Sequence, residues 1–259
     1  MRAIPDDNLS YPVLITLTNG GTGSGFFLNT SDATYLVTAK HVFIDQISNN
    51  LIADEATLLS LPRDPTEDGQ NIFRLRLVAL QTSGDLRLHP SRDILVVRIG
   101  IVTKEGTETI TNFLSGVTTL KNSKSGILGA APESFKKFSE VLVANEVFLF
   151  GYPTSLGLKE LPQINFDQPL LRRGIVAGLN KTLHSIILDC PVYPGNSGGP
   201  VVQAESNGLN TEFKIIGVVS QFVPFVETWV NTVHQYSNTN IANSGYSVVT
   251  PIEFALELL

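Results

Sequence analysis

The sequence contains a single cysteine, a single methionine and a single tryptophan among its 259 residues. One cysteine, Cys190, cannot form a disulfide within the chain, so packing and hydrogen bonds have to hold the fold together. This cysteine usage fits a reducing compartment or a fold that needs no disulfides. We therefore expect a soluble cytoplasmic protein.

Two further absences exclude classes of partner. The formal net charge is -6, so there is no basic surplus to neutralise phosphates, and we expect no nucleic-acid partner. No apolar run approaches the roughly 18 residues of a membrane-spanning helix. The segment 141–150 is only ten residues long and contains Asn145 and Glu146. The first residues also lack the basic and apolar regions of a signal peptide, so we expect no membrane partner.

Short β-type runs dominate the chain, separated by Gly, Pro, Asn, Asp and Ser. Six runs precede residue 100 and six follow residue 145, which predicts an all-β fold of two six-stranded antiparallel β-barrels. We expect strands at 11–18, 24–29, 34–38, 56–61, 72–80 and 93–99, and at 146–151, 173–179, 185–188, 199–203, 213–221 and 245–250.

The domain boundaries follow from composition. Residues 1–100 would form the first barrel and 141–259 the second, which ends in a helix over 251–259 because Pro251 precedes strong helix formers. Residues 101–140 are rich in Thr, Ser, Lys and Gly and are predicted to connect the barrels. Two stretches, 45–89 and 158–171, have no assigned role.

Three short segments stand in a fixed order, namely Thr38–His41, Arg92–Val96 and Pro194–Pro200. A histidine at a strand end can accept a proton, because its pKa lies near neutrality. Asp93 heads an apolar strand, and a carboxylate that enters an interior needs a partner, which His41 would provide. The aspartate would then hold the imidazole in the correct tautomer.

Ser197 lies in a glycine-flanked loop that leads into a predicted strand. The flanking glycines permit backbone angles closed to other residues, so a substrate carbonyl can approach closely. We expect the backbone N–H groups of Gly195 and Ser197 to form an oxyanion hole. Together with His41 and Asp93, Ser197 would be the nucleophile of an acyl transfer.

The order His, Asp, Ser and these strings resemble the trypsin-like (chymotrypsin-fold) serine peptidases, and most closely their HtrA/Deg branch. Segments 150–157 and 173–177 are also similar to HtrA strings. HtrA proteins continue into PDZ domains, whereas this sequence ends after the predicted helix. The resemblance implies a chymotrypsin-like fold and a serine endopeptidase that acts on a protein or peptide without a cofactor or metal.

The resemblance also implies further site residues. Ser220 would hydrogen-bond the Asp93 carboxylate, although an ordinary strand serine is the alternative, and the residues after it would pair with the substrate backbone. None of the residues implied for the specificity pocket is acidic, so we expect cleavage after small or medium apolar residues. These pocket residues are Pro191, Val192, Tyr193, Gln221, Phe222, Gly245, Tyr246 and Ser247.

Several alternatives stay open. The main one is a catalytically silent, protease-like peptide-binding module, and an esterase-type hydrolase is another. Cys190 is a rival nucleophile, although a thiol in an apolar strand is usually inert.

Asn196 stands where secreted trypsin-like zymogens have an aspartate that pairs with a new N-terminus, so we expect no activation by N-terminal cleavage. A regulatory partner protein stays open as well. The remaining histidines, which we expect to be structural and not metal ligands, are His89, His184 and His234.

Overall fold

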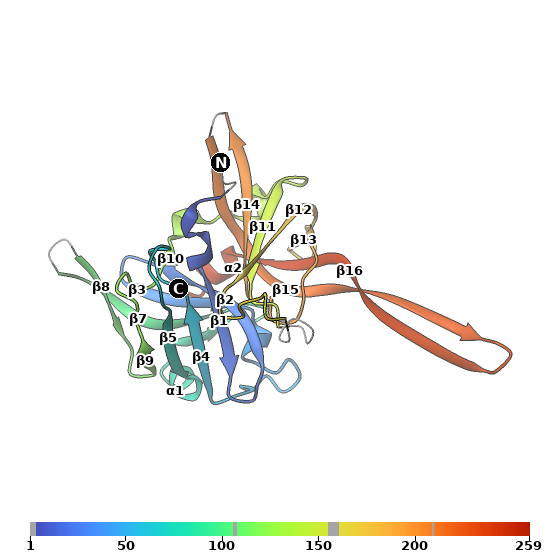
Figure 1. Cartoon of the computed structure of the whole chain (residues 1–259), viewed down its shortest axis with the longest axis horizontal. Coiled ribbons are helices and arrows are strands. Elements are labelled where there is room, and N and C mark those ends of the chain that lie inside the picture. The colour runs from blue at the N-terminus through green and yellow to red at the C-terminus, as the bar shows by residue number, and fades with distance from the viewer. Residues whose placement is uncertain (1–3, 106–107, 155–160, 209) are drawn as a thin grey trace.

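The computed structural model describes residues 4–105, 108–154, 161–208 and 210–259. Two β-sheets lie against each other, and a long hairpin projects from the second sheet (Figure 1). The predicted all-β, two-barrel fold is confirmed. The predicted insertion at 158–171 lies partly outside the described residues, as does the HtrA-like segment 150–157.

The N-terminal sheet has ten strands where we expected six. Its main path is β6-β7-β3-β2-β1-β4-β5-β9, while β8 pairs with β7 and β10 pairs in parallel with β2. The sheet is strongly curved but is not closed by hydrogen bonds between its first and last strands. The strands are β1 Pro12–Leu17, β2 Thr22–Asn29, β3 Ala33–Thr38, β4 Glu55–Ser60, β5 Asn71–Arg76, β6 Leu86–Leu88, β7 Leu95–Glu105, β8 Glu108–Phe113, β9 Val117–Lys121 and β10 Gly129–Ala130.

Part of the predicted connection belongs to this sheet. Within residues 101–140, β8 pairs with β7 and β9 pairs with β5. The threonines that suggested a linker are also typical of half-exposed strands, because β-branched side chains suit a pleated surface. The following segment contains two 3₁₀ turns, η3 at Pro132–Ser134 and η4 at Phe138–Glu140, and leads into the second barrel.

Strand β3 is buried along its whole length. Leu36 points into the interior of the N-terminal sheet, whereas Tyr35 and Val37 pack on the other face together with residues of the second barrel. A strand buried on both faces has an apolar run without alternation, as residues 35–37 do. Because β3 is buried on both faces, its C-terminal end is held in place, and His41 follows three residues after that end.

The expected strand over 72–80 is only half correct. Strand β5 ends at Arg76, and a short helix, α1, spans Leu77–Thr82. Leu77 and Leu80 are spaced three apart, and both are buried on one face of this helix. The spacing favours a helical turn over a continued strand.

The C-terminal barrel is closed by six strands in the order β11-β12-β13-β16-β15-β14. Alternate residues such as Val147, Leu149 and Ile216 fill its interior. Its strands and terminal helix are β11 Glu146–Gly151, β12 Leu170–Asn180, β13 Ser185–Asp189, β14 Pro200–Asn207, β15 Asn210–Asn231, β16 Tyr236–Pro251 and α2 Glu253–Leu256.

Helix α2 is shorter than predicted, and two histidines hold it in place. His184 Nε2 lies 2.8 Å from the Glu253 carboxylate, and His89 Nε2 lies 3.2 Å from the Glu257 carboxylate. Both histidines serve to dock the C-terminus. No helix among the described residues is long and apolar enough to cross a bilayer.

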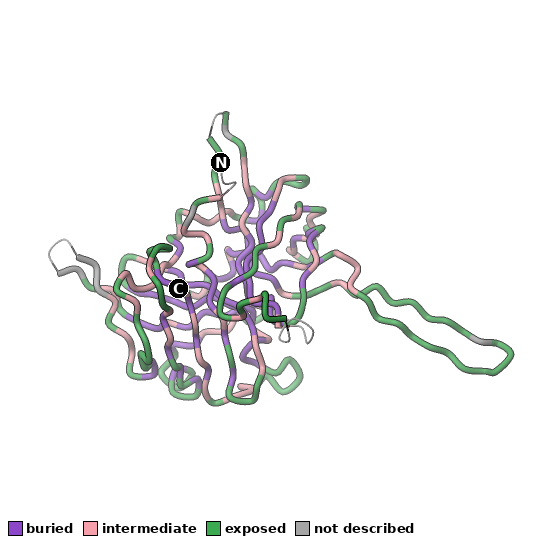
Figure 2. Tube along the Cα trace, viewed as in Figure 1, coloured by how far each residue is buried: buried purple, intermediate pink, exposed green. Residues whose placement is uncertain are grey.

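The largest difference from the sequence prediction is the length of β15 and β16. We expected these strands over 213–221 and 245–250, but they run on into a projecting hairpin. We call residues 222–246 the arm. It extends away from both sheets, and most of its residues beyond its root are exposed (Figure 2). Its turn contains no glycine, and Gln235 takes a positive φ of 50° in its place.

Candidate active site

His41 and Asp93 are brought together by the pairing of two strands. The end of β3 pairs with the start of β7, with Thr38 opposite Leu95. His41 follows β3 and Asp93 precedes β7. His41 Nδ1 lies 2.7 Å from Asp93 Oδ2, and the backbone N–H of His41 donates to Asp93 Oδ1 at 3.0 Å. The two bonds hold Asp93 beside His41, and both residues line the cleft described below.

Ser197 lies in the loop between β13 and β14, and the shape of this loop depends on glycine. Gly195 and Gly198 have positive φ angles of 96° and 83°. A Cβ on Gly198 would lie 2.1 Å from Thr38 Oγ1, and one on Gly195 would lie 2.2 Å from a backbone oxygen. Both positions therefore need glycine for conformation and for space.

The loop leaves two backbone donors without a protein partner. The N–H groups of Asn196 and Gly198 donate to the carbonyls of Tyr193 and Val219, at 3.0 and 2.7 Å. Within the described part of the chain, neither Gly195 nor Ser197 donates its N–H to another protein group. These are the two donors that the sequence predicted for an oxyanion hole.

The carbonyl of Pro194 is held by Thr154, in the loop after β11. Its oxygen accepts the Thr154 backbone N–H at 2.8 Å and the Thr154 hydroxyl at 3.3 Å. The same hydroxyl lies 2.8 Å from the hydroxyl of Thr22 on β2. The carbonyl and the N–H of a planar trans peptide point in opposite directions. Because the Pro194 carbonyl points to Thr154, the Gly195 N–H of the same peptide points away from Thr154.

Sequence reasoning missed the role of Ser24. Its hydroxyl donates to the Gly195 carbonyl at 2.6 Å and accepts the Tyr152 N–H at 3.0 Å, while its own N–H donates to the Ser197 carbonyl at 2.7 Å. Ser24 therefore ties the N-terminal sheet to the serine loop. The only signal was its place at the start of the strand that we expected over 24–29.

Asn196 is buried, and its side chain serves the loop itself. Its Oδ1 accepts the Tyr193 N–H at 3.0 Å, whereas its Nδ2 has no partner among the described residues. The amide oxygen thus stabilises the turn from within. That no N-terminal cleavage is needed stays a prediction.

A cleft of about 520 Å³ joins these groups. His41, Asp93 and Ser197 all line it, although no hydrogen bond joins Ser197 to His41 among the described residues. Such bonds are often long in free enzymes and tighten with substrate. The other lining residues are Gln46, Val192, Tyr193, Pro194, Val219, Ser220, Gln221 and Phe222.

Four of the residues predicted for the specificity pocket line this cleft, and four do not. Those that do are Val192, Tyr193, Gln221 and Phe222, of which Phe222 is 42% exposed. Ser247 is buried with its hydroxyl on the Cys190 carbonyl, at 2.9 Å, so it faces away from the cleft. The other predicted residues outside the lining are Pro191, Gly245 and Tyr246.

The expected bond between Ser220 and Asp93 is not formed. Ser220 lines the cleft, but its hydroxyl donates to the carbonyl of Val248 at 3.1 Å. A hydroxyl has one proton, and a carboxylate can only accept, so the Ser220 hydroxyl cannot also donate to Asp93. The bulge between Val219 and Gln221 directs this side chain across the β15–β16 pair.

Cys190 is a poor rival nucleophile. It is fully buried in the core of the C-terminal barrel, and burial raises the pKa of its thiol. The thiolate is the reactive form, so both effects make this cysteine inert.

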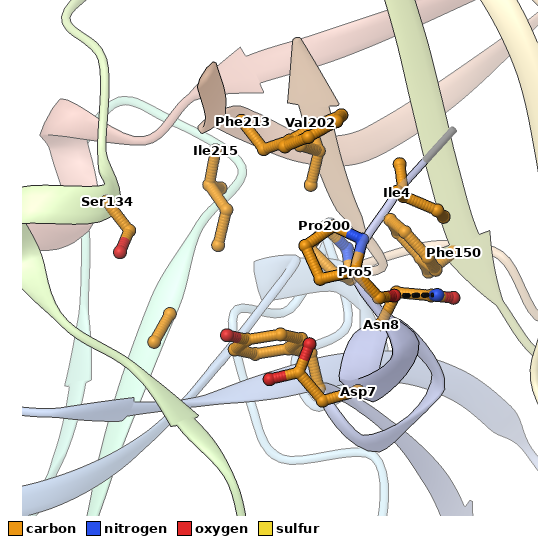
Figure 3. Close-up of a pocket in the computed structure, with 12 residues that line it drawn as sticks. Ile4, Pro5, Asp7, Asn8, Ser134, Phe150, Pro200, Val202, Phe213 and Ile215 are labelled. Carbon is orange, nitrogen blue, oxygen red and sulfur yellow. Dashed lines mark hydrogen bonds between the residues drawn. The ribbon is translucent and has the colours of Figure 1, made fainter. Parts of the chain in front are cut away.

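A second hollow of about 280 Å³ lies apart from these residues (Figure 3). Apolar side chains such as Phe150, Val202 and Ile215 line it, together with the N-terminal Pro5. None of His41, Asp93 and Ser197 borders it. Among the described residues, no cluster of three His, Cys, Asp or Glu side chains could hold a metal ion.

Solved structures with this fold include three that are at most 17% identical, a level that indicates shared fold alone. The HtrA-type protease AlgW, solved with a tripeptide, is 14% identical with a TM-score of 0.52, and the match covers 97% of this chain but only 59% of AlgW. Deg5 is 17% identical with a TM-score of 0.54, covering 97% and 88% of the two chains. Human heparin binding protein is 10% identical with a TM-score of 0.55, covering 98% and 91%.

Sequence comparison is more selective. No curated protein sequence matches the chain. A family model described as a trypsin-like peptidase domain matches residues 23–209, which is most of the sequence and includes His41, Asp93 and Ser197. The chain therefore belongs to the trypsin-like peptidase domain family.

Proposed function

We propose that this protein is a serine endopeptidase that cleaves proteins or peptides through an acyl-enzyme on Ser197. The observation that carries the proposal is the 2.7 Å contact between His41 and Asp93 in the cleft that Ser197 also lines. Family membership supports a serine protease.

The reaction would proceed in two halves. His41 Nε2 takes the proton of the Ser197 hydroxyl while Oγ attacks the substrate carbonyl carbon, and Asp93 stabilises the resulting imidazolium. The Gly195 and Ser197 N–H groups bind the oxygen that becomes negative. His41 then donates its proton to the leaving amine, and the C–N bond breaks. Water attacks the acyl-enzyme by the same route and releases Ser197. No step calls for a cofactor or a metal.

The lining of the cleft supports cleavage after small or medium apolar residues. Val192, Tyr193 and Phe222 are apolar or aromatic, and no acidic side chain stands near them in the lining except Asp93, which is bound to His41. The Arg172 guanidinium lies 4.6 Å from the centroid of the Tyr193 ring. A lysine or arginine side chain of the substrate would thus find no free carboxylate in the lining and would be repelled by the positive charge of Arg172.

The alternative is a protease-like module that binds peptides without turnover. The free N–H groups of Gly195 and Ser197 favour the enzyme, because a binding module has no use for an oxyanion hole. An esterase-type hydrolase would turn over esters but no peptide.

Digestion of an unfolded protein tests the proposal. The wild-type chain should generate discrete fragments, and Ser197→Ala at equal concentration should generate none above background. Intact substrate with both proteins would favour the binding module. Ester hydrolysis without peptide cleavage would favour the esterase.

A further inference from the structure

The arm exposes an unusual density of apolar side chains. Nine of its residues are large hydrophobics that are at least 42% exposed, and Trp229 is the only tryptophan of the chain. Residues 222–246 contain one charged side chain, Glu227, if His234 is neutral. The nine are Phe222, Phe225, Val226, Trp229, Val230, Val233, Tyr236, Ile241 and Tyr246.

The exposed apolar surface of the arm is typical of a binding site. An isolated two-stranded hairpin is marginally stable in water. Monomeric proteins rarely expose contiguous apolar patches larger than a few hundred Å², and larger ones mark interaction sites. Five of the nine side chains are aromatic, and aromatic side chains dominate binding energy at interfaces.

The outer edge of β15 leads from the candidate active site into the arm. Strand β14 pairs with β15 only as far as Val218, opposite Pro200. From Ser220 to Asn231, β15 pairs with β16 alone among the described residues, so its other edge is open. Ser220, Gln221 and Phe222 at the start of this edge line the cleft beside Ser197. The cleft wall and the arm therefore belong to the same strand, in which bulges lie between Val219 and Gln221 and between Phe222 and Pro224.

We propose that the arm is an extended substrate-binding site, which takes as an added β-strand the apolar, uncharged stretch that precedes the scissile bond. The proposal rests on the proposed protease function and names the class of substrate. Backbone pairing along 220–222 would continue outward along 223–231, because strand addition uses main-chain groups of any sequence. The occupant is thus an extended polypeptide segment rather than a folded surface.

The two faces of the arm set the side-chain preference. Cross-strand partners place Phe225 and Trp229 on one face, and Val226 and Val230 on the other. An added strand projects its own side chains alternately to the two faces, so apolar residues would find contacts on both. Pro224 has no N–H and removes one donor, as prolines on edge strands do. About ten substrate residues would pair along residues 222–231 of β15, one substrate residue opposite each residue of the strand.

Trp229 supplies a direct binding test, because it is the sole tryptophan and is 65% exposed. We would titrate the Ser197→Ala protein with two tryptophan-free peptides that share one cleavage site. The long peptide carries ten apolar residues before the site, and the short one carries three. We expect a blue shift of the emission with the long peptide only. No shift with the long peptide would overturn the proposal. A blue shift on concentrating the protein alone would show that a second copy covers the arm, and would overturn it as well.

Cleavage of the same peptides locates the site on the arm. The wild-type protein should cleave the long peptide with a kcat/KM at least about tenfold above that of the short one, mostly through KM, since burial of aromatic side chains favours binding. Phe225→Thr and Trp229→Thr should each lower this ratio several-fold. The matched control is Tyr236→Thr, which removes a similarly exposed aromatic from the β16 side of the arm and should leave the ratio unchanged.

The outcomes separate the two proposals. A ratio near one for the wild-type protein, or an equal loss in all three variants, would contradict binding along the β15 edge. If neither peptide is cleaved while Trp229 responds to the long one, the protease function is wrong and the binding site stands.

Discussion

The carbonyl oxygen of Pro194 accepts the backbone N–H of Thr154 at 2.8 Å. This bond joins the loop after β11 to the serine loop, and the Thr154 hydroxyl adds a second contact to the same oxygen. The rotation of the peptide between Pro194 and Gly195 decides whether an N–H or a carbonyl faces the attacking serine. In the mechanism that we propose, Thr154 would therefore be a positioning residue for an oxyanion donor.

Thr154→Val should lower kcat by about tenfold, below the 10²–10³ of losing a donor outright, because the backbone bond stays in place. Thr154→Ser keeps the hydroxyl and should retain most of the activity. Steady-state kinetics on a short peptide would show the loss in kcat with KM little changed. A rise in KM at constant kcat would instead indicate that Thr154 shapes the binding cleft.

The three residues that we propose as catalytic should act as a unit. Ser197→Ala and His41→Ala should each remove most of the activity, and the double variant should be little worse than either. Asp93→Asn should lower the rate on the order of 10⁴-fold, because an amide favours the wrong tautomer of His41. Peptide cleavage measured with purified variants checks all four. Additive losses in the double variant would show that Ser197 and His41 serve different steps.

Specificity should follow the apolar lining of the cleft. Profiling on a peptide library should give cleavage after Val, Ala or Leu, with Lys and Arg strongly disfavoured next to Arg172. Dominant cleavage after Arg, Lys or Glu would contradict this assignment of the pocket.

Cys190 should resist alkylation in the folded protein. Burial raises the pKa of its thiol above the ordinary value, so the thiolate forms only at more alkaline pH. We expect slow reaction with iodoacetamide at pH 8, faster reaction as the pH rises, and prompt reaction at pH 8 once the chain is unfolded in urea. The Ser197→Ala protein should behave identically. Rapid alkylation at pH 8 that abolishes activity would restore Cys190 as a candidate nucleophile.

The local strings predicted that His41 and Asp93 would be partners, and the two residues are in contact. The strand that ends at Thr38 and the apolar strand after Asp93 pair as neighbours, which accounts for the meeting of two residues far apart in the chain. The glycines of the serine loop marked positions where no Cβ fits. The strand ends and the glycine positions depend on local sequence, and the sequence therefore predicts them.

Features that depend on distant contacts were not predictable. The Ser220 hydroxyl turns to Val248 because of a bulge that no residue pattern announces. Ser24 reaches the serine loop only because the two sheets meet there. The arm was missed because its turn has no Asn-Gly or Gly-rich signal, although the aromatic and β-branched residues around Trp229 are typical of a strand.

Labelling with a fluorophosphonate probe tests the central claim most directly, since the probe forms a stable bond only with an activated serine. The wild-type protein should gain one probe mass per chain, located on the peptide that contains Ser197, and His41→Ala should label far more slowly. Ser197→Ala should not label. An unlabelled wild-type protein, or equal labelling of Ser197→Ala, would contradict catalysis by this serine.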